Sequence, residues 1–129
     1  MKYSFLNSKI VAFSTLLGLL LVSCSSAVEN LGGGCQVVAN PQAESFLKVT
    51  NNLSSGLQWN LSAYAFGADM KPGECTIFGL DAGSYSVEFN QCNIGDSKCT
   101  SAFGGTKTEM FSVASGNTYT YDIYLSFFQ

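Results

Sequence analysis

The sequence predicts an all-β fold, a small sandwich of six to seven antiparallel strands within residues 46–129. Three observations predict it. Hydrophobic and polar residues alternate with a period of two in several short segments after residue 45. Turn-forming residues separate these segments at short intervals, as they do in two-sheet proteins. No segment after Cys24 shows the sustained periodicity of an amphipathic helix.

The first 23 residues have the features of an export signal. Residues 1–9 carry two lysines, Lys2 and Lys9, and no acidic residue. An apolar run over residues 10–22 follows. A helix over this run spans roughly 20 Å, which is short of the ~30 Å hydrocarbon core of a bilayer. A basic start, a short apolar run and small residues at its end are typical of a secretory signal peptide. We therefore expect residues 1–23 to form a signal helix that is removed on export.

The end of this signal resembles the lipobox of bacterial lipoproteins. Leu21-Val22-Ser23-Cys24 places an aliphatic residue and two small or medium residues before a cysteine. The resemblance implies cleavage before Cys24, a diacylglycerol group in thioether linkage to its sulfur, and an acyl chain such as palmitate on its amino group. Each buried CH₂ contributes roughly 0.8 kcal/mol, so several chains anchor a protein firmly. The alternative is an ordinary secretory signal with a cysteine nearby by chance.

The residues after Cys24 bear on location and on domain organisation. Ser25 and Ser26 stand where an aspartate usually retains lipoproteins of Gram-negative bacteria at the inner membrane. The resemblance therefore implies a lipid-anchored protein at the outer membrane or cell surface. Residues 24–45 are mostly small and polar and include Gly32-Gly33-Gly34, which predicts a flexible tether ahead of the domain.

The predicted strands follow one another with turn signals between them. They cover residues 46–50, 57–64, 75–80, 85–90, 106–113 and 118–128. Trp59 shares a face with Leu57 and Leu61, so we expect it in the core. A turn is expected over residues 70–74, where Pro72 and Gly73 suit its central positions.

Two segments of the second half, LDAGSYSVEF and TKTEMFSVASGNTYTYDIYL, carry a wider resemblance. They are similar to the transthyretin-like, carboxypeptidase-regulatory and PEGA-type β-sandwich modules. The matching residues are Leu80, Gly83, Ser84, Tyr85, Val87, Gly116 and Ile123. The resemblance implies an Ig-like or transthyretin-like sandwich that acts as a spacer, a display unit or a carbohydrate-binding accessory without catalysis.

Four cysteines follow Cys24, and an even number in an exported domain predicts two disulfides. Cys92 and Cys99 flank a polar loop, NIGDSK, so we favour a Cys92–Cys99 bridge, which leaves Cys35–Cys75. The alternative pairs Cys75 with Cys92 and Cys35 with Cys99. The absence of a CxxC pair argues against a zinc site, and no metal or other cofactor is predicted.

The charged residues restrict the function. After residue 23 the sequence has four lysines, nine acidic residues, and no arginine or histidine. This composition disfavours nucleic-acid binding, which needs a basic surface. Without histidine, the sequence also lacks the commonest general base. The carboxylate of Asp81 is expected in a turn, and that of Asp122 on an exposed strand face. We therefore predict that the protein is not an enzyme.

Three aromatic residues, Tyr64, Tyr124 and Phe128, fall on faces opposite the main apolar sets. Exposed aromatic side chains stack on sugars or bind a protein partner, so these three are the candidate binding patch. The sequence thus predicts a membrane-anchored lipoprotein with a non-catalytic β-sandwich for surface presentation or binding. The alternative is a small inhibitor that presents the loop over residues 92–99 to the active site of a hydrolase.

Overall fold

The computed structural model describes residues 34–129. The predicted signal peptide and the lipidation site Cys24 lie outside the described residues, as does the first part of the predicted tether. No helix among residues 34–129 is long and apolar enough to cross a membrane. The described elements are β1 (Gln36–Ala39), β2 (Ser45–Asn51), β3 (Gly56–Leu61), the 3₁₀ helix η1 (Ser62–Tyr64), β4 (Phe66–Met70), β5 (Cys75–Leu80), β6 (Gly83–Gly95), β7 (Lys98–Val113), β8 (Thr118–Ile123) and the 3₁₀ helix η2 (Leu125–Phe128).

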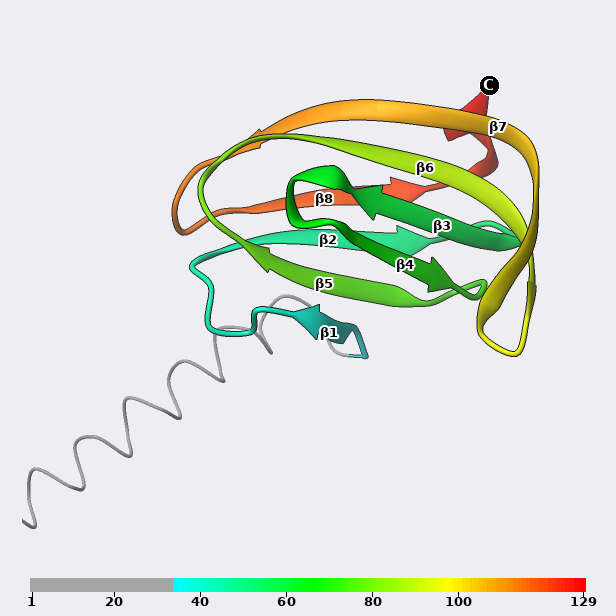
Figure 1. The fold of residues 1–129 in the computed structure, drawn as a ribbon, viewed down its shortest axis with the longest axis horizontal. Helices are drawn as coiled ribbons and strands as arrows, with labels where there is room; N and C mark the ends of the chain where they lie inside the picture. Colours follow the sequence, from blue (N-terminus) through cyan, green and yellow to red (C-terminus); the bar gives the residue numbers. More distant parts are fainter. Residues whose placement is uncertain (1–33) are drawn as a thin grey trace, which may run out of the picture. The chain divides into compact units, whose positions relative to one another are not determined.

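These strands form two four-stranded sheets (Figure 1). One sheet has the order β1-β5-β2-β8 and the other has the order β4-β3-β6-β7. The all-β prediction is confirmed, and the two sheets face each other as in a sandwich. The strand count and directions differ from the prediction, because the described residues form eight strands and two of the strand pairs, β1 with β5 and β2 with β8, are parallel.

Two strands were absent from the sequence prediction. β1 lies inside the segment predicted to be a flexible tether, and Val37 and Ala39 pair with Ile77 and Phe78 of β5. The tether prediction is therefore wrong for residues 36–39, because the partner strand is distant in sequence and a four-residue segment carries little local pattern. β4 pairs with β3 in antiparallel register. It lies immediately before the expected turn and contains a glycine and an aspartate, residues that are depleted in strands.

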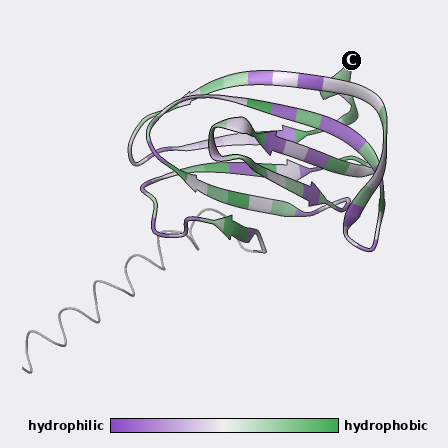
Figure 2. Cartoon of the chain, viewed as in Figure 1, coloured by the Kyte–Doolittle hydropathy of each residue, from purple (hydrophilic) through white to green (hydrophobic). Residues whose placement is uncertain are grey.

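The core lies between the two sheets, as the alternating strand pattern predicts. Figure 2 shows hydrophobic and hydrophilic segments alternating along the strands. Trp59 is fully buried, in agreement with the prediction, and its indole Nε1 donates a hydrogen bond to Oγ1 of Thr76 at 3.3 Å. Its ring packs against Phe66 and Phe78, with ring centroids 5.5 and 6.1 Å away. The hydrogen bond offsets the cost of burying the indole N–H.

The predicted final strand ends earlier than expected. β8 stops at Ile123, and η2 turns the chain into the gap between the edge strands β7 and β8. The Phe127 ring lies 5.2 Å from the Phe89 ring, and Nζ of Lys107 donates a hydrogen bond to the backbone oxygen of Phe127 at 3.0 Å. The same ammonium group lies 4.5 Å from the centre of the Phe127 ring. The aromatic side chain therefore closes one side of the sandwich instead of extending a strand.

The structure contains the favoured pair of disulfides. Cys35 is bonded to Cys75, with Cα atoms 4.6 Å apart, and Cys92 is bonded to Cys99, with Cα atoms 5.5 Å apart. The segment between Cys92 and Cys99 is not the expected loop, because β6 continues to Gly95 and β7 begins at Lys98. Asp96 and Ser97 form a two-residue turn in which both φ angles are positive, at 51° and 72°. Such turns match the twist of the strands they join.

Candidate functional site

Four chain connections meet at one end of the sandwich. They are the loop between β1 and β2, the η1 segment, the link between β5 and β6, and the turn between β7 and β8, all at the left in Figure 1. The strand registers place them together, because Ser45 at the start of β2 pairs with Leu80 at the end of β5, and Gly83 pairs with Val113. The loops of a sandwich end carry function in many proteins because the sheets hold them rigidly.

The loop between β1 and β2 lies directly on β5. Asn40 has a positive φ of 51°, which reverses the chain, and its Nδ2 donates a hydrogen bond to the backbone oxygen of Gly79 at 2.9 Å. The N–H of Ala43 closes the turn on the oxygen of Asn40 at 3.1 Å. A Cβ at position 79 would overlap this backbone oxygen and would lie 2.7 Å from Cβ of Ala43. Gly79 is therefore what allows the loop to approach the sheet.

Two tyrosines hold the link between β5 and β6. The hydroxyl of Tyr64 accepts a hydrogen bond from the Asp81 N–H at 2.9 Å, and the hydroxyl of Tyr85 donates to the Asp81 backbone oxygen at 2.5 Å. The two hydroxyl oxygens are 3.3 Å apart and are hydrogen-bonded to each other. This hydrogen bond, together with burial and the nearby charges, raises the pKa of Tyr85 to about 12. The phenol of Tyr85 therefore stays neutral at ordinary pH, and the two hydroxyls fix the backbone of Asp81.

The turn between β7 and β8 is fastened to the start of β2. Ser45 donates its hydroxyl proton to the backbone oxygen of Ala114 at 3.0 Å. Ser115 donates to a carboxylate oxygen of Glu44 at 2.7 Å. The backbone N–H of Phe46 reaches the oxygen of Asn117 at 3.1 Å. These hydrogen bonds join the loop between β1 and β2 to the turn between β7 and β8, and both segments lie beside the link at Asp81.

Between these loops lie two adjoining clefts. The larger has a volume of about 530 Å³ and is lined by Asn40, Pro41, Gln42, Ala43, Tyr64, Gly79, Leu80 and Asp81. The smaller has a volume of about 230 Å³ and reaches Glu44, Ser45, Ala82 and Ser115. They share Gln42, Ala43, Leu80 and Asp81, and together we call them the loop-end cleft. The larger volume falls in the range of small-molecule sites.

The loop-end cleft is lined by both polar and apolar groups and carries two carboxylates. Asp81 uses its backbone atoms for the contacts with the tyrosines, and its exposed carboxylate adds negative charge beside that of Glu44. Asn40 and Gln42 add amide groups, and neither lining includes a lysine. Such a lining suits hydroxyl groups, amides and cations and repels phosphate or carboxylate ligands. Within residues 34–129, no three histidine, cysteine, aspartate or glutamate side chains gather where they could hold a metal ion.

Comparisons with known protein families, with curated proteins and with solved structures find no match. The function of this chain is therefore inferred from the geometry of the loop-end cleft.

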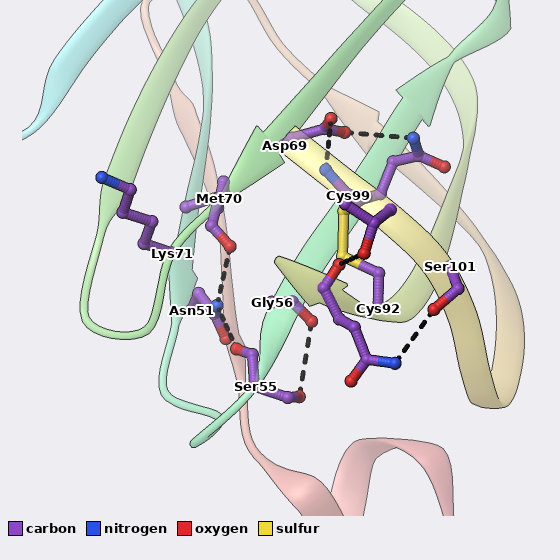
Figure 3. The surroundings of a disulfide bond; sticks show 12 residues. Asn51, Ser55, Gly56, Asp69, Met70, Lys71, Cys92, Cys99 and Ser101 are labelled. Carbon is purple, nitrogen blue, oxygen red and sulfur yellow. Dashed lines mark hydrogen bonds between the residues drawn. A yellow bond between two sulfur atoms is a disulfide. The ribbon is translucent and has the colours of Figure 1, made fainter. Parts of the chain in front are cut away.

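The opposite end of the sandwich carries both disulfides. Cys75 begins β5, so its bond to Cys35 holds the incoming chain there. Around the second disulfide, Asp69 of β4 accepts hydrogen bonds from the Cys99 N–H at 3.0 Å and from the Gln58 amide at 3.0 Å (Figure 3). Gly56 lies against the same disulfide, where a Cβ would be 2.8 Å from the Cys92 sulfur. The β6–β7 hairpin is therefore folded onto β3 and β4 instead of projecting freely.

The three residues of the predicted aromatic patch are not brought together. Tyr64 lines the loop-end cleft and packs on Phe78, with ring centroids 5.1 Å apart. Tyr124 follows the end of β8 at the opposite end of the sandwich, where it is 56% exposed. Phe128 lies against Gly105 and Phe127. The patch prediction is wrong as a single surface, because residues 124–128 leave the strand whose alternation placed them on one face.

Other sequence-predicted residues are also separated. Asp81 lies at the loop end, whereas Asp122 pairs with Thr50 near the other end of the sheet, so the two carboxylates do not form a pair. Sequence reasoning missed Asn40, Gln42 and Gly79 as cleft residues. The Asn40-Pro41 dipeptide is a turn signal, and a Cys35–Cys75 bridge places the segment after Cys35 beside β5. Together these two signals would have indicated the loop.

Proposed function

We propose that this protein is a lipid-anchored, non-catalytic β-sandwich that binds a polar, uncharged or basic ligand in the loop-end cleft. The observation that supports it is the position of the Cys35–Cys75 disulfide. It holds the incoming chain at the end of the sandwich opposite the cleft. Within residues 34–129, the cleft therefore lies away from the point at which the preceding chain joins the domain.

The anchor rests on the resemblance of residues 21–24 to a lipobox. Residues 24–34 can span at most about 40 Å when fully extended, which limits the distance between the domain and a membrane-bound Cys24. The proposed location is the outer membrane or the cell surface. The similarity of residues 74–125 to transthyretin-like, carboxypeptidase-regulatory and PEGA-type modules supports a binding or display role, and it remains a prediction.

The side chains that line the cleft restrict the chemical class of the ligand. Saccharides and peptides offer the hydroxyl and amide groups that Asn40, Gln42 and Asp81 can bind, and the acidic lining disfavours anionic ligands. A carbohydrate or a basic protein segment is thus the partner class. The inhibitor alternative has no structural observation in its favour, because residues 96 and 97 form a tight turn with positive φ angles and not an extended segment.

Two experiments test the proposal. Cys24→Ser in the full chain should move the protein from the membrane fraction to the soluble fraction, and unchanged fractionation contradicts the anchor.

For the cleft, the full chain is probed on an array of neutral glycans and of neutral and basic peptides. Asp81→Asn and Gln42→Ala should weaken any binding, whereas Asp122→Asn, which makes the same change at the other end, should not. Equal effects of Asp81→Asn and Asp122→Asn contradict the cleft.

A further inference from the structure

The outer edge of β7 has no strand partner among residues 34–129. β7 is 16 residues long and forms one border of its sheet. Long edge strands usually carry features that prevent pairing with another chain, such as proline, like charges or a bulge. β7 has a register irregularity near Gly104, whose φ is 70°, but from Thr106 to Val113 it pairs regularly with β6. This regular part contains no proline.

The only charged residues of this regular part are Lys107 and Glu109. They lie two positions apart, so they share one face, and Nζ of Lys107 is 3.6 Å from Oε1 of Glu109. Their side chains are 43% and 34% exposed. The residues of the other face, Thr106, Thr108, Met110 and Ser112, are uncharged and exposed, and Met110 is 77% exposed. The edge therefore carries two opposite charges arranged symmetrically about Thr108.

This arrangement is complementary to itself. If two β7 strands pair in antiparallel directions about Thr108, Lys107 of each copy stands opposite Glu109 of the other. Thr106 then stands opposite Met110, and Gly105 stands opposite Phe111. Opposite charges directly across two strands stabilise the pairing, and two such pairs form at once. A shift of two residues in one direction would place Lys107 opposite itself, and a shift in the other would place Glu109 opposite itself. The charges therefore select one register.

We propose that β7 is a docking surface for a second copy of this chain, joined edge to edge about Thr108 in a two-fold symmetric dimer. The pairing continues the sheet β4-β3-β6-β7 into the same sheet of the second copy. The loop-end clefts lie at the two far ends of the pair and both stay open, because their linings include no residue of β7. The proposal does not depend on lipidation of Cys24 or on ligand binding in the cleft.

Cysteine cross-linking in the full chain tests the register. Residues directly opposite each other in antiparallel strands have Cα atoms roughly 4.5–5.5 Å apart, within the range of a disulfide. Thr108→Cys should therefore give a covalent dimer on mild oxidation. Thr106→Cys alone and Met110→Cys alone should not, because each lies about 13 Å from its own symmetry mate. Chains carrying Thr106→Cys mixed with chains carrying Met110→Cys should link. Equal or absent linking of the Thr108 and Thr106 variants overturns the proposal.

Charge reversal tests the complementarity. In the Thr108→Cys background, Glu109→Lys should reduce linking about tenfold, because two attractive pairs become repulsive. Glu109→Gln removes the attraction without adding a repulsion, so it should reduce linking less than Glu109→Lys does. Lys98→Glu reverses a charge at the far end of β7 and should have little effect. Equal linking of the Glu109→Gln and Glu109→Lys variants would contradict pairing through these charges.

Discussion

The hydroxyl oxygens of Tyr64 and Tyr85 lie 3.3 Å apart over the peptide groups of Asp81, and between them they bind both the N–H and the C=O of that residue. Tyr64 comes from η1 and Tyr85 from β6, so this contact joins three elements at the loop-end cleft. It fixes the position of a cleft residue through its backbone and leaves the carboxylate of Asp81 available for a ligand.

The tyrosine pair should act as one unit in stability measurements. We expect Tyr64→Phe and Tyr85→Phe each to lower the free energy of unfolding by about 0.5–1.5 kcal/mol, because each removes a hydrogen bond to the backbone. The double variant should lose less than the sum of the two, since the hydroxyls also bind each other. Urea unfolding followed by tryptophan fluorescence provides the three values. Strictly additive losses would show that the two hydroxyls act independently.

Tyr85 should make stability depend on pH in the alkaline range. Its pKa rises from 10.0, its ordinary value, to about 12 in the folded protein. The neutral phenol is favoured by folding, so its contribution is complete below pH 10 and is lost as the pH rises toward 12. Burial also raises the pKa of Tyr121, which acts in the same direction. We expect the free energy of unfolding to fall between pH 10 and 12, and to fall less in Tyr85→Phe. Identical curves for the two proteins would contradict this assignment.

Gly79→Ala should disturb the cleft without a change in charge or polarity. The added Cβ would meet the backbone oxygen of Asn40, which cannot move aside without displacing the loop over residues 40–43. We expect a loss of about 1–3 kcal/mol in stability, as for other overpacked sites. Gly95→Ala is the control, because its Cβ would come no nearer than 3.8 Å to Thr100. A thermal melt of both variants compares them, and equal losses would contradict the close approach of the loop at Gly79.

The two disulfides should contribute unequally. The Cys35–Cys75 bridge closes a chain segment with a sequence separation of 40, and the Cys92–Cys99 bridge closes one of 7. Loop-entropy estimates give roughly 4 and 2.5 kcal/mol for segments of these lengths. Replacing Cys35 and Cys75 together by serine should therefore lower the stability more than replacing Cys92 and Cys99 together. Denaturant midpoints of the two double variants test the order, and the reverse order would show that native contacts outweigh chain entropy.

Asp69 should hold the β6–β7 hairpin against the sheet. Its two carboxylate oxygens accept hydrogen bonds from the Cys99 N–H and the Gln58 amide. In Asp69→Ala both donors lose their acceptor, and we expect a loss of about 1–3 kcal/mol. Hydrogen exchange of the Cys99 amide should also accelerate, while exchange at Trp59 in the neighbouring strand should change little. An unchanged rate at Cys99 would contradict the role of this carboxylate.

Part of the fold was predictable because it depends on local pattern. The alternation in residues 57–61 placed Leu57, Trp59 and Leu61 on the buried face, and the structure confirms it. The bounds of β5 agree with the expected strand over residues 75–80. The favoured disulfide pairing is also confirmed, since Cys92 and Cys99 are close in sequence and only one pairing then remains. In each case the decisive residues lie within a few positions of one another.

The candidate site was largely beyond prediction. Tyr64 was expected on an exposed face of a strand, but it lies in a 3₁₀ helix with its ring against Phe78 and its hydroxyl on Asp81. Asn40 and Gln42 were assigned to a tether. Their place in the cleft depends on the parallel pairing of β1 with β5, and the two strands of that pair are joined by no turn that the sequence could signal.

The sequence by itself determined which side of the alternating strands faces the core, because side chains in a strand alternate between two faces and water excludes the apolar one. It also determined that residues 46–129 are built from strands and that four cysteines form two bridges. Only the tertiary structure decided which loops meet, which tyrosines form hydrogen bonds with the Asp81 backbone, and which edge strands have no partner among residues 34–129. Most of those relationships join residues far apart in the sequence, such as Tyr64 with Asp81 at 17 positions and Glu44 with Ser115 at 71. No local pattern encodes such contacts, since they follow from the order in which the strands assemble into sheets.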